Sequence, residues 1–375
     1  MKSILLTTTA IVAFAGVAAA DENAGVSFSG SAALGYNDDW EDGFYWETQL
    51  DIAMSTELDN GLTAGAWFNI EIDDEGATND VFDGNNDFNL VSSDLLLSLK
   101  SDTAGLYFGD TSFAAESQWN SAGDMEADAF SEADGEVVVR GDIMMAGIDA
   151  SVSYAVANVD GGYVADDGSE NSAVDQLSVG VSGDMGMFNF AVAYQAEVDN
   201  AGYFASNGDF TDSEIFGVSA GTSFGGADIT VAYASDETMS TNSTGIQVSY
   251  PFGPVTGTVY YVSEDDGSGD DNYGVTVAYE DGPIAVTGKI RSEQARDEWN
   301  IDGSYEVGNG LTVLAGMLNE NEGDNSDYYV AGSLDLGGGA TFLASYAEDD
   351  DGDQSDEIGA PEYLPGTTVK LTFKF

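Results

Sequence analysis

The chain of 375 residues contains no cysteine and no histidine. The absence of cysteine excludes a disulfide framework, and without either residue the usual zinc sites are excluded too. Without histidine there is no Ser-His-Asp or Cys-His catalytic arrangement, and no GxSxG, HExxH or P-loop motif occurs. Carboxylate pairs of the glycosidase kind carry no information here, because 68 acidic residues produce such pairs by chance. We therefore expect no enzyme, no catalytic residues, no cofactor and no dedicated metal site.

Basic residues are also scarce, since 8 Lys and Arg stand against 68 Asp and Glu and give a formal net charge of -60. A chain this acidic repels phosphate backbones, so nucleic acid is excluded as a partner, whereas cations are attracted. Such an excess of charge is also typical of disorder. However, 43% of the residues are hydrophobic and 11% are aromatic, and they are arranged in regular segments. We expect a folded protein.

The first 20 residues read as an export signal. Lys2 precedes an apolar run that ends in Ala18-Ala19-Ala20, which predicts a secretory signal peptide cleaved after Ala20. A transmembrane anchor is the alternative, but the run is short, threonines interrupt it, and a polar sequence begins at Asp21. Residues 21 to 375 are then expected to form a single domain.

The rest of the chain consists of alternating segments of about ten residues joined by two kinds of connection. The first kind is short and centred on glycine, at residues 59–61, 101–105, 146–148, 185–187, 224–227, 252–254, 281–283, 308–310 and 336–340. The second kind is longer and often acidic, as at residues 73–87, 160–175, 319–327 and 347–363. Nine short turns between ten longer connections predict twenty strands. In an antiparallel meander all the tight turns then lie at one end and the acidic loops at the other, as in an outer-membrane barrel.

The two faces of the expected strands differ in polarity. In residues 44–54, Phe44, Leu50 and Met54 share one face, while Glu47 and Asp51 lie on the other. A soluble β-sandwich or a Ca²⁺-loaded solenoid would fit such segments one by one. The number of strands, the lack of helical signals and the confinement of charge to one face favour a closed barrel that turns its charged face toward a lumen.

The last residues, "GTTVKLTFKF", form an amphipathic strand that ends on Phe375. Together with the leader, the turns "FGGA" and "LGGGA", and "LYFGD" at 106–110, this ending resembles the trimeric general porins of Gram-negative outer membranes over essentially the whole chain. The resemblance implies an all-β transmembrane barrel with short periplasmic turns and long extracellular loops, a homotrimer in outer-membrane lipid, and recognition of Phe375 by the barrel-assembly machinery. It also implies passive diffusion of small hydrophilic solutes and ions. The family norm is sixteen strands, so the count of twenty is a departure, although both numbers are even.

By the same resemblance, the connection at residues 110–136 folds into the lumen and narrows the channel. Its acidic side would consist of Glu116, Asp124, Glu126, Asp128, Glu132 and Asp134. The opposing wall would offer Lys100, Arg140, Lys289 and Arg291, with Arg296 as a further candidate. A transverse field between loop and wall would orient dipolar solutes. The alternative is that this loop lies outside the barrel as another solvated acidic loop.

Three functions stay open from the sequence. The first is a non-specific, cation-favouring diffusion pore. The second is a substrate-selective channel, for which Trp67, Trp119 and Tyr261 could supply an aromatic track along the lumen. The third is a secreted acidic protein that binds Ca²⁺. The loop at residues 349–357 could hold Ca²⁺ loosely, but Gln354 stands where an EF-hand loop requires Gly.

Overall fold

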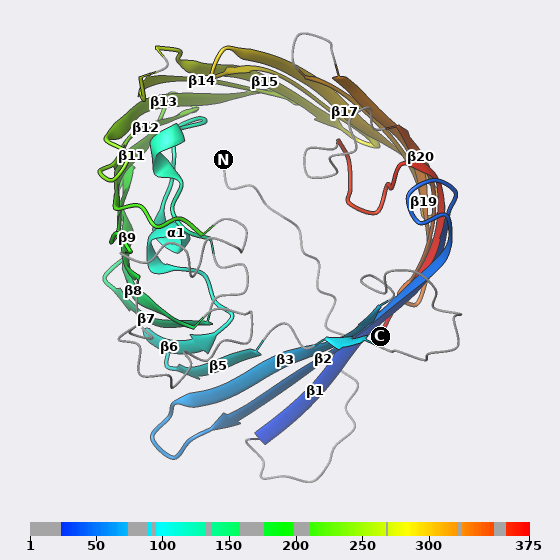
Figure 1. Ribbon diagram of the computed structural model, residues 1–375, viewed down its shortest axis with the longest axis horizontal. Coiled ribbons are helices and arrows are strands. Elements are labelled where there is room, and N and C mark those ends of the chain that lie inside the picture. Colours follow the sequence, from blue (N-terminus) through cyan, green and yellow to red (C-terminus); the bar gives the residue numbers. More distant parts are fainter. Residues whose placement is uncertain are drawn as a thin grey trace.

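A computed structural model describes residues 24–73, 89–91, 95–132, 137–157, 176–198, 210–267, 269–320, 325–348 and 358–375. Nearly all of these residues belong to one antiparallel sheet (Figure 1). Its strands are β1 (Ala24–Asn37), β2 (Gly43–Glu57), β3 (Thr63–Asp73), β4 (Asn89–Val91), β5 (Leu95–Lys100), β6 (Ala104–Gly109), β7 (Val137–Met145), β8 (Ile148–Ala157), β9 (Leu177–Met185), β10 (Phe188–Gln195), β11 (Ile215–Phe224), β12 (Ala227–Asp236), β13 (Thr241–Phe252), β14 (Val255–Asp265), β15 (Asn272–Asp281), β16 (Ile284–Glu293), β17 (Arg296–Gly308), β18 (Leu311–Glu320), β19 (Asn325–Gly337), β20 (Ala340–Glu348) and β21 (Gly366–Lys374).

The sheet closes on itself, because β1 pairs with β2 on one edge and with β21 on the other. The short β4 and the following β5 pair with different stretches of the same edge of β3, so they occupy one position in the ring. The barrel therefore has twenty strands, which confirms the count made from the turns rather than the family norm of sixteen. The leader at residues 1–20 lies outside the described residues.

All nine of the short glycine-containing turns expected from the sequence are hairpins, and they lie at one end of the barrel. Glycine supplies the positive φ that such turns require, as at Gly225 and Gly226 (φ +63° and +87°). The other end is less uniform than the sequence analysis expected. Connections 38–42, 237–240 and 294–295 at that end are short, and Gln294 and Ala295 form a tight turn with positive φ. The acidic stretches 74–88, 158–175 and 349–357 lie outside the described residues.

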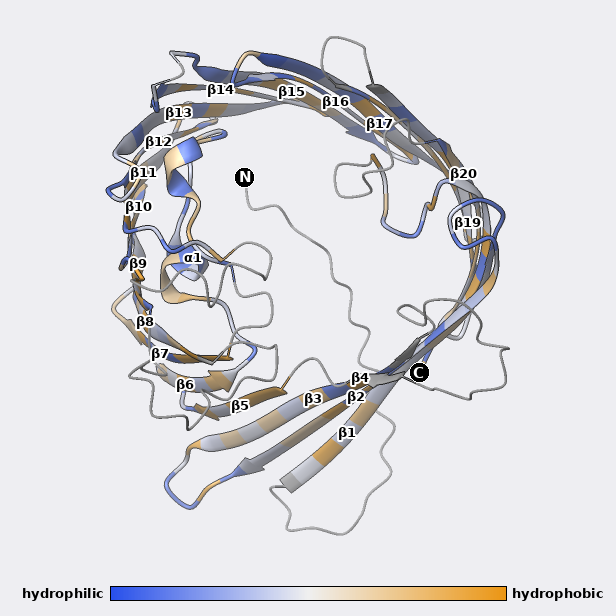
Figure 2. Ribbon diagram, in the orientation of Figure 1, coloured by the Kyte–Doolittle hydropathy of each residue, from blue (hydrophilic) through white to orange (hydrophobic). Residues whose placement is uncertain are grey.

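The outer surface of the barrel is a belt of exposed apolar side chains. Hydrophobic and hydrophilic residues alternate along strands such as β1 and β3 (Figure 2). Members of this belt include Phe28, Leu50, Leu97, Val152, Val218, Val231, Ile246, Val259, Val275, Ile290, Ile301, Val330 and Phe373. Phe44, Leu50 and Met54, which were predicted to share one face, are all exposed on this belt. Among the described residues, no helix is long and apolar enough to span a membrane.

Buried residues gather where other segments of the chain pack against the inner wall, rather than between two layers of sheet. The largest of these contacts involve the helices α1 (Ala114–Gln118) and η1 (Glu126–Asp128), which follow β6, and the residues just before β21. The buried apolar residues of this protein therefore lie between the inner wall and the segments that project into the lumen.

Candidate pore constriction

The connection between β6 and β7 lies inside the ring, as predicted, with α1 close to β8, β9 and β10 (Figure 1). Serine hydroxyls of the wall accept hydrogen bonds from its backbone. The amide N–H of Ala114 donates to Ser153 at 2.8 Å, that of Ala115 to Ser178 at 2.7 Å, and that of Ala127 to Ser243 at 2.9 Å. These bonds satisfy backbone groups that have no water around them. The loop is thus docked along the wall from β8 to β13.

Glycines on the inner wall leave room for this docking. A Cβ at Gly180 would lie 2.2 Å from the carbonyl oxygen of Ala114, and one at Gly245 would lie 2.2 Å from that of Ala122. A Cβ at Gly217 would lie 2.6 Å from the indole ring of Trp119. Any side chain at these positions would push the loop away from the wall. The wall is therefore shaped to receive the loop.

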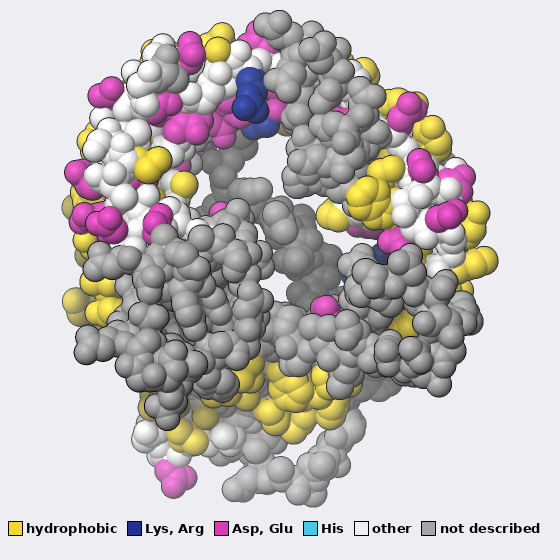
Figure 3. Space-filling model, viewed as in Figure 1, with side chains coloured by type: hydrophobic (Ala, Val, Ile, Leu, Met, Phe, Trp, Pro, Cys, Tyr) yellow, Lys and Arg dark blue, Asp and Glu magenta, His cyan; other side chains and the backbone are white. Residues whose placement is uncertain are grey.

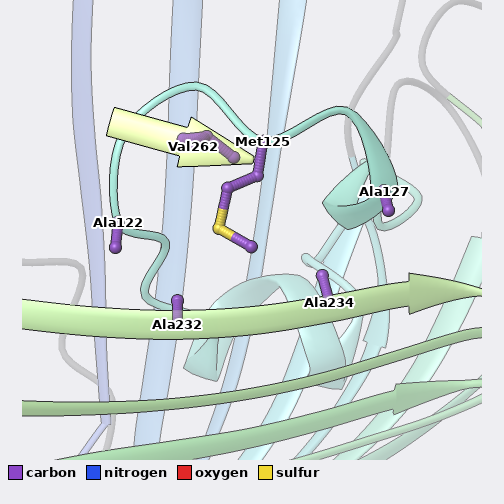
Figure 4. Packing of buried hydrophobic residues seen from close by; sticks show 6 residues of the cluster. All are labelled: Ala122, Met125, Ala127, Ala232, Ala234 and Val262. Carbon is purple, nitrogen blue, oxygen red and sulfur yellow. The ribbon is translucent and has the colours of Figure 1, made fainter. Parts of the chain in front are cut away.

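Apolar contacts complete the docking. Ala122, Met125 and Ala127 of the loop face Ala232, Ala234 and Val262 of the wall, and all six are buried (Figure 4). At the two ends of the loop, Phe113 packs with Val138 and Ala155, and Phe130 packs with Ala193 and Ile215. Burial of one such large apolar side chain contributes about 1.5 to 3 kcal/mol.

Three of the predicted acidic residues are held in place at the inner side of this loop. The Tyr260 hydroxyl donates to Asp124 at 2.7 Å, the Asn272 amide donates to Glu126 at 2.9 Å, and the Trp119 indole N–H donates to Asp128 at 2.8 Å. These hydrogen bonds hold the three carboxyl groups in defined positions on the loop.

Burial acts differently on Asp124 and Asp128. Burial raises the pKa of the Asp128 carboxyl to about 7. The hydrogen bond from Trp119 lowers this pKa only in part, and the negative charges of Glu264 and Asp124 raise it further. Burial also acts to raise the pKa of Asp124. There it is outweighed by hydrogen bonds, including that of Tyr260, and by the charges of Lys289 and Arg291, so the pKa of Asp124 lies below its ordinary value.

The other predicted acids are placed less uniformly. Glu116 lies in α1, and burial raises the pKa of its carboxyl, against a hydrogen bond with Ser112 that lowers it. Glu132 is exposed. Asp134 lies outside the described residues.

The predicted basic residues form two separate groups. Arg291 on β16 lies beside the loop, 3.8 Å from Asp124, and is also paired with Glu293 at 2.7 Å and with Glu298. Lys289, on the same face of β16, adds positive charge near Asp124. Figure 3 shows basic side chains on this wall bordered by acidic ones. Acid and base are therefore in direct contact here, rather than facing each other across open lumen.

The second basic group lies on β5 to β7. The Arg140 and Lys100 head groups lie 5.0 Å and 5.4 Å from the centre of the Tyr107 ring. Arg140 also pairs with Asp142 at 3.2 Å and donates to the carbonyl oxygen of Ser112 at 2.9 Å. It ties the start of the loop to the wall. The further candidate Arg296 is exposed at the start of β17.

Several residues that shape the site were not expected from the sequence. Glu264 accepts a hydrogen bond from the backbone N–H of Glu126 at 3.2 Å and another from the Ser243 hydroxyl. Asn272 also donates to the carbonyl oxygen of Asp124 at 3.1 Å. Strand parity places these side chains on the inner face, but only the folded loop shows what they bind.

The aromatic track that a substrate-selective channel would need does not form among the residues that the structure describes. Tyr261 belongs to the exposed outer face, because the preceding Tyr260 is the inward residue, so its placement along the lumen was wrong. Trp119 is packed against the wall at Gly217, and Trp67 lies on β3. No observation therefore favours a substrate-selective channel.

Comparison with known proteins identifies the family of this chain. Residues 7–354 match the family described as "Gram-negative porin". Among solved structures, a triple mutant of the Rhodopseudomonas blastica porin is 16% identical, with a TM-score of 0.47 over 94% of this chain and 100% of that one. Another mutant of the same porin is 16% identical, with a TM-score of 0.46 and the same coverage. No curated protein is significantly similar in sequence. The family match covers most of the chain, so this protein belongs to the Gram-negative porin family and forms an outer-membrane channel for passive diffusion.

Proposed function

We propose that this channel favours cations and passes small hydrophilic solutes without strong selectivity. The observation that carries the proposal is the local excess of carboxyl groups at the docked loop. Two basic residues, Lys289 and Arg291, stand among six acidic ones, namely Asp124, Glu126, Asp128, Glu264, Glu293 and Glu298. Asp128 is only partly charged near pH 7, because its pKa is about 7, but the carboxylates still outnumber the two basic residues. The field at this point of the pore is therefore negative, which concentrates cations and repels small anions.

Arg291 contributes little net positive charge to the lumen. Its guanidinium is shared by Glu293, Glu298 and Asp124, so its charge is largely compensated locally. Glu126 and Glu132 are exposed and have no basic partner among the described ion pairs. At about 0.1 M salt the Debye length is roughly 10 Å, so these charges act across much of a pore and lose their effect as salt rises.

The test is the reversal potential of single channels in planar bilayers under a KCl gradient. The double substitution Glu126→Gln and Glu132→Gln should shift this potential toward zero. The control is Asp59→Asn with Asp281→Asn, which removes two exposed acids at the tight-turn end of the barrel. An equal or larger shift for the control would contradict the role of the loop, and an anion-selective wild type would contradict the cation preference itself.

We further propose that the leader is removed after Ala20 and that Phe375 serves as the assembly signal in a homotrimer that carries no cofactor and catalyses no reaction. Phe375 and Gly30 exchange backbone hydrogen bonds of 2.8 and 3.2 Å, so the last residue is part of the seam between β21 and β1. Recognition of this strand by the assembly machinery would couple insertion to closure of the ring. Loose Ca²⁺ binding at the acidic loop 349–357 concerns residues outside the described part of the chain.

A further inference from the structure

A second segment also lies inside the ring. Residues 358–365, which immediately precede β21, lie near β17 to β20, across the lumen from α1 (Figure 1, red). They are far from the loop at 110–132 in the sequence and touch a different part of the wall.

This segment is packed against the wall. The Tyr363 side chain is buried, and its ring centre lies 4.8 Å from that of Tyr329 on β19. Ala331, Leu343 and Ala347 complete the cluster on the wall side, and Ile358 and Ala360 of the segment pack against it. The cluster is one of four that bury apolar side chains among the described residues, and the other three involve the loop at 110–132.

The wall is shaped for this segment as it is for the first loop. Gly316 faces Tyr329 and Ile358, and a Cβ there would lie 2.5 Å from the first and 3.0 Å from the second. The Tyr329 hydroxyl donates to the carboxylate of Asp302, which fixes the ring on which Tyr363 packs. Gly316, against which Ile358 packs, stands in the middle of β18, and Ser151, which accepts a hydrogen bond from Gln118 of the first loop, stands in the middle part of β8. Both inward segments thus reach the middle of the barrel wall.

Hydrogen bonds also hold the end of the segment. The Asn37 amide, which is fully buried, donates to the carbonyl oxygen of Pro365 at 2.8 Å and to the Thr368 hydroxyl at 3.0 Å. The backbone N–H of Thr367 donates to Asp38 at 2.5 Å. The segment is therefore fixed at both its apolar cluster and its junction with β21.

We propose that residues 358–365 form a second constriction, so that the passage is bounded by two docked segments on opposite walls rather than by one loop and a bare wall. The proposal rests on the function as a diffusion channel and adds a second determinant of pore size. Glu362 is exposed on this segment, and a hollow of about 380 Å³ between it and β1 to β3 is lined among others by Glu41, Glu47, Glu71 and Lys370. Lys370 is paired with Glu47 at 2.6 Å. Four carboxyl groups thus surround one basic residue at this hollow, so this side of the passage is acidic as well.

The absence of cysteine permits a direct test, since Glu362→Cys introduces a single thiol. The thiol is modified with methanethiosulfonate reagents that carry either a sulfonate or a trimethylammonium group. Both adducts should lower single-channel conductance and slow sugar entry into proteoliposomes, and the cationic adduct should also reduce cation preference. Asp59→Cys is the matched control, because it also replaces an exposed acid but lies at a tight turn.

Complete labelling of Glu362→Cys without a change in conductance or sugar entry would overturn the proposal. A second variant, Ile358→Ala with Tyr363→Ala, removes the apolar anchors and should raise conductance and the size limit while the barrel keeps its heat-modifiable gel mobility. Unchanged conductance in an intact barrel would equally count against it. These readouts differ from the reversal potential of the Glu126 and Glu132 variant, so failure of the cation preference and failure of the second constriction are distinguishable.

Discussion

Gly245 on β13 offers the sharpest test of how the loop at 110–132 is held. A Cβ at this position would stand 2.2 Å from the carbonyl oxygen of Ala122, whereas real Cβ contacts are essentially never under 3.0 Å. The atom in the way is backbone, so it cannot rotate aside. Gly245→Ala should therefore push this part of the loop about 1 Å away from the wall and into the lumen.

The free energy of the loop's contacts decides whether the loop shifts slightly or leaves the wall. Full release would lose at least two hydrogen bonds, from Ala127 to Ser243 and from Glu126 to Glu264, each worth about 0.5 to 1.5 kcal/mol. It would also expose Met125, at about 1.5 to 3 kcal/mol. Release thus costs at least about 2.5 to 6 kcal/mol, whereas a 1 Å shift only lengthens these contacts. We expect a displaced loop that still lies in the pore and narrows it.

The assay is single-channel conductance together with the size limit for sugar entry into proteoliposomes. Both should fall for Gly245→Ala. Gly257→Ala on the adjacent β14 is the control, because nothing lies within 4 Å of a Cβ there. Wild-type conductance and size limit for Gly245→Ala, in a barrel with normal heat-modifiable mobility, would refute the docking of the loop at this wall.

Two further predictions concern the lipid face and the pH response. Val275→Arg, on the exposed face in the middle of β15, should lower the free energy of unfolding in urea by about 2 to 4 kcal/mol. Thr276→Arg, on the inner face, should lower it little. Equal losses for the two variants would contradict the assignment of faces. Because burial raises the pKa of Asp128 to about 7, Asp128 gains a proton as pH falls from 8 to 6, and cation preference should weaken over this range. Asp128→Asn keeps an acceptor for Trp119 and should show a smaller change in reversal potential, while an unaltered pH response would show that other groups cause it.

The fold could be predicted because its determinants are local in sequence. Alternation of apolar and polar residues over one strand fixes which face meets lipid, and a glycine turn fixes where the strand ends. Nine such turns between ten longer connections predicted twenty strands, a number that the resemblance to sixteen-stranded relatives did not suggest. The connections at 237–240 and 294–295 were expected among the longer ones but are short, because they form tight turns without the glycine pattern of the other end.

The site could be predicted only in part, because its contacts are long-range. Strand parity places Ser153, Ser178 and Ser243 on the inner face, but nothing in their own segments shows that they bind the backbone of one loop. Tyr261 was misplaced because Tyr260 and Tyr261 are adjacent, so either could have been the inward residue. The contact of Arg291 with both Glu298 and Asp124 joins residues from the wall and the loop, which no single segment contains.

The number of strands and the second inward segment have a common physical consequence. Barrel diameter grows roughly in proportion to strand number, so twenty strands enclose a lumen about a quarter wider than sixteen strands do. One loop docked on the wall from β8 to β13 leaves the opposite wall of such a lumen open. Residues 358–365 cover that opposite wall at β17 to β20, through Tyr363 and its contact with Tyr329. A wide barrel can thus keep a narrow passage, because each wall carries its own docked segment, and the passage between them is lined with carboxylates on both sides.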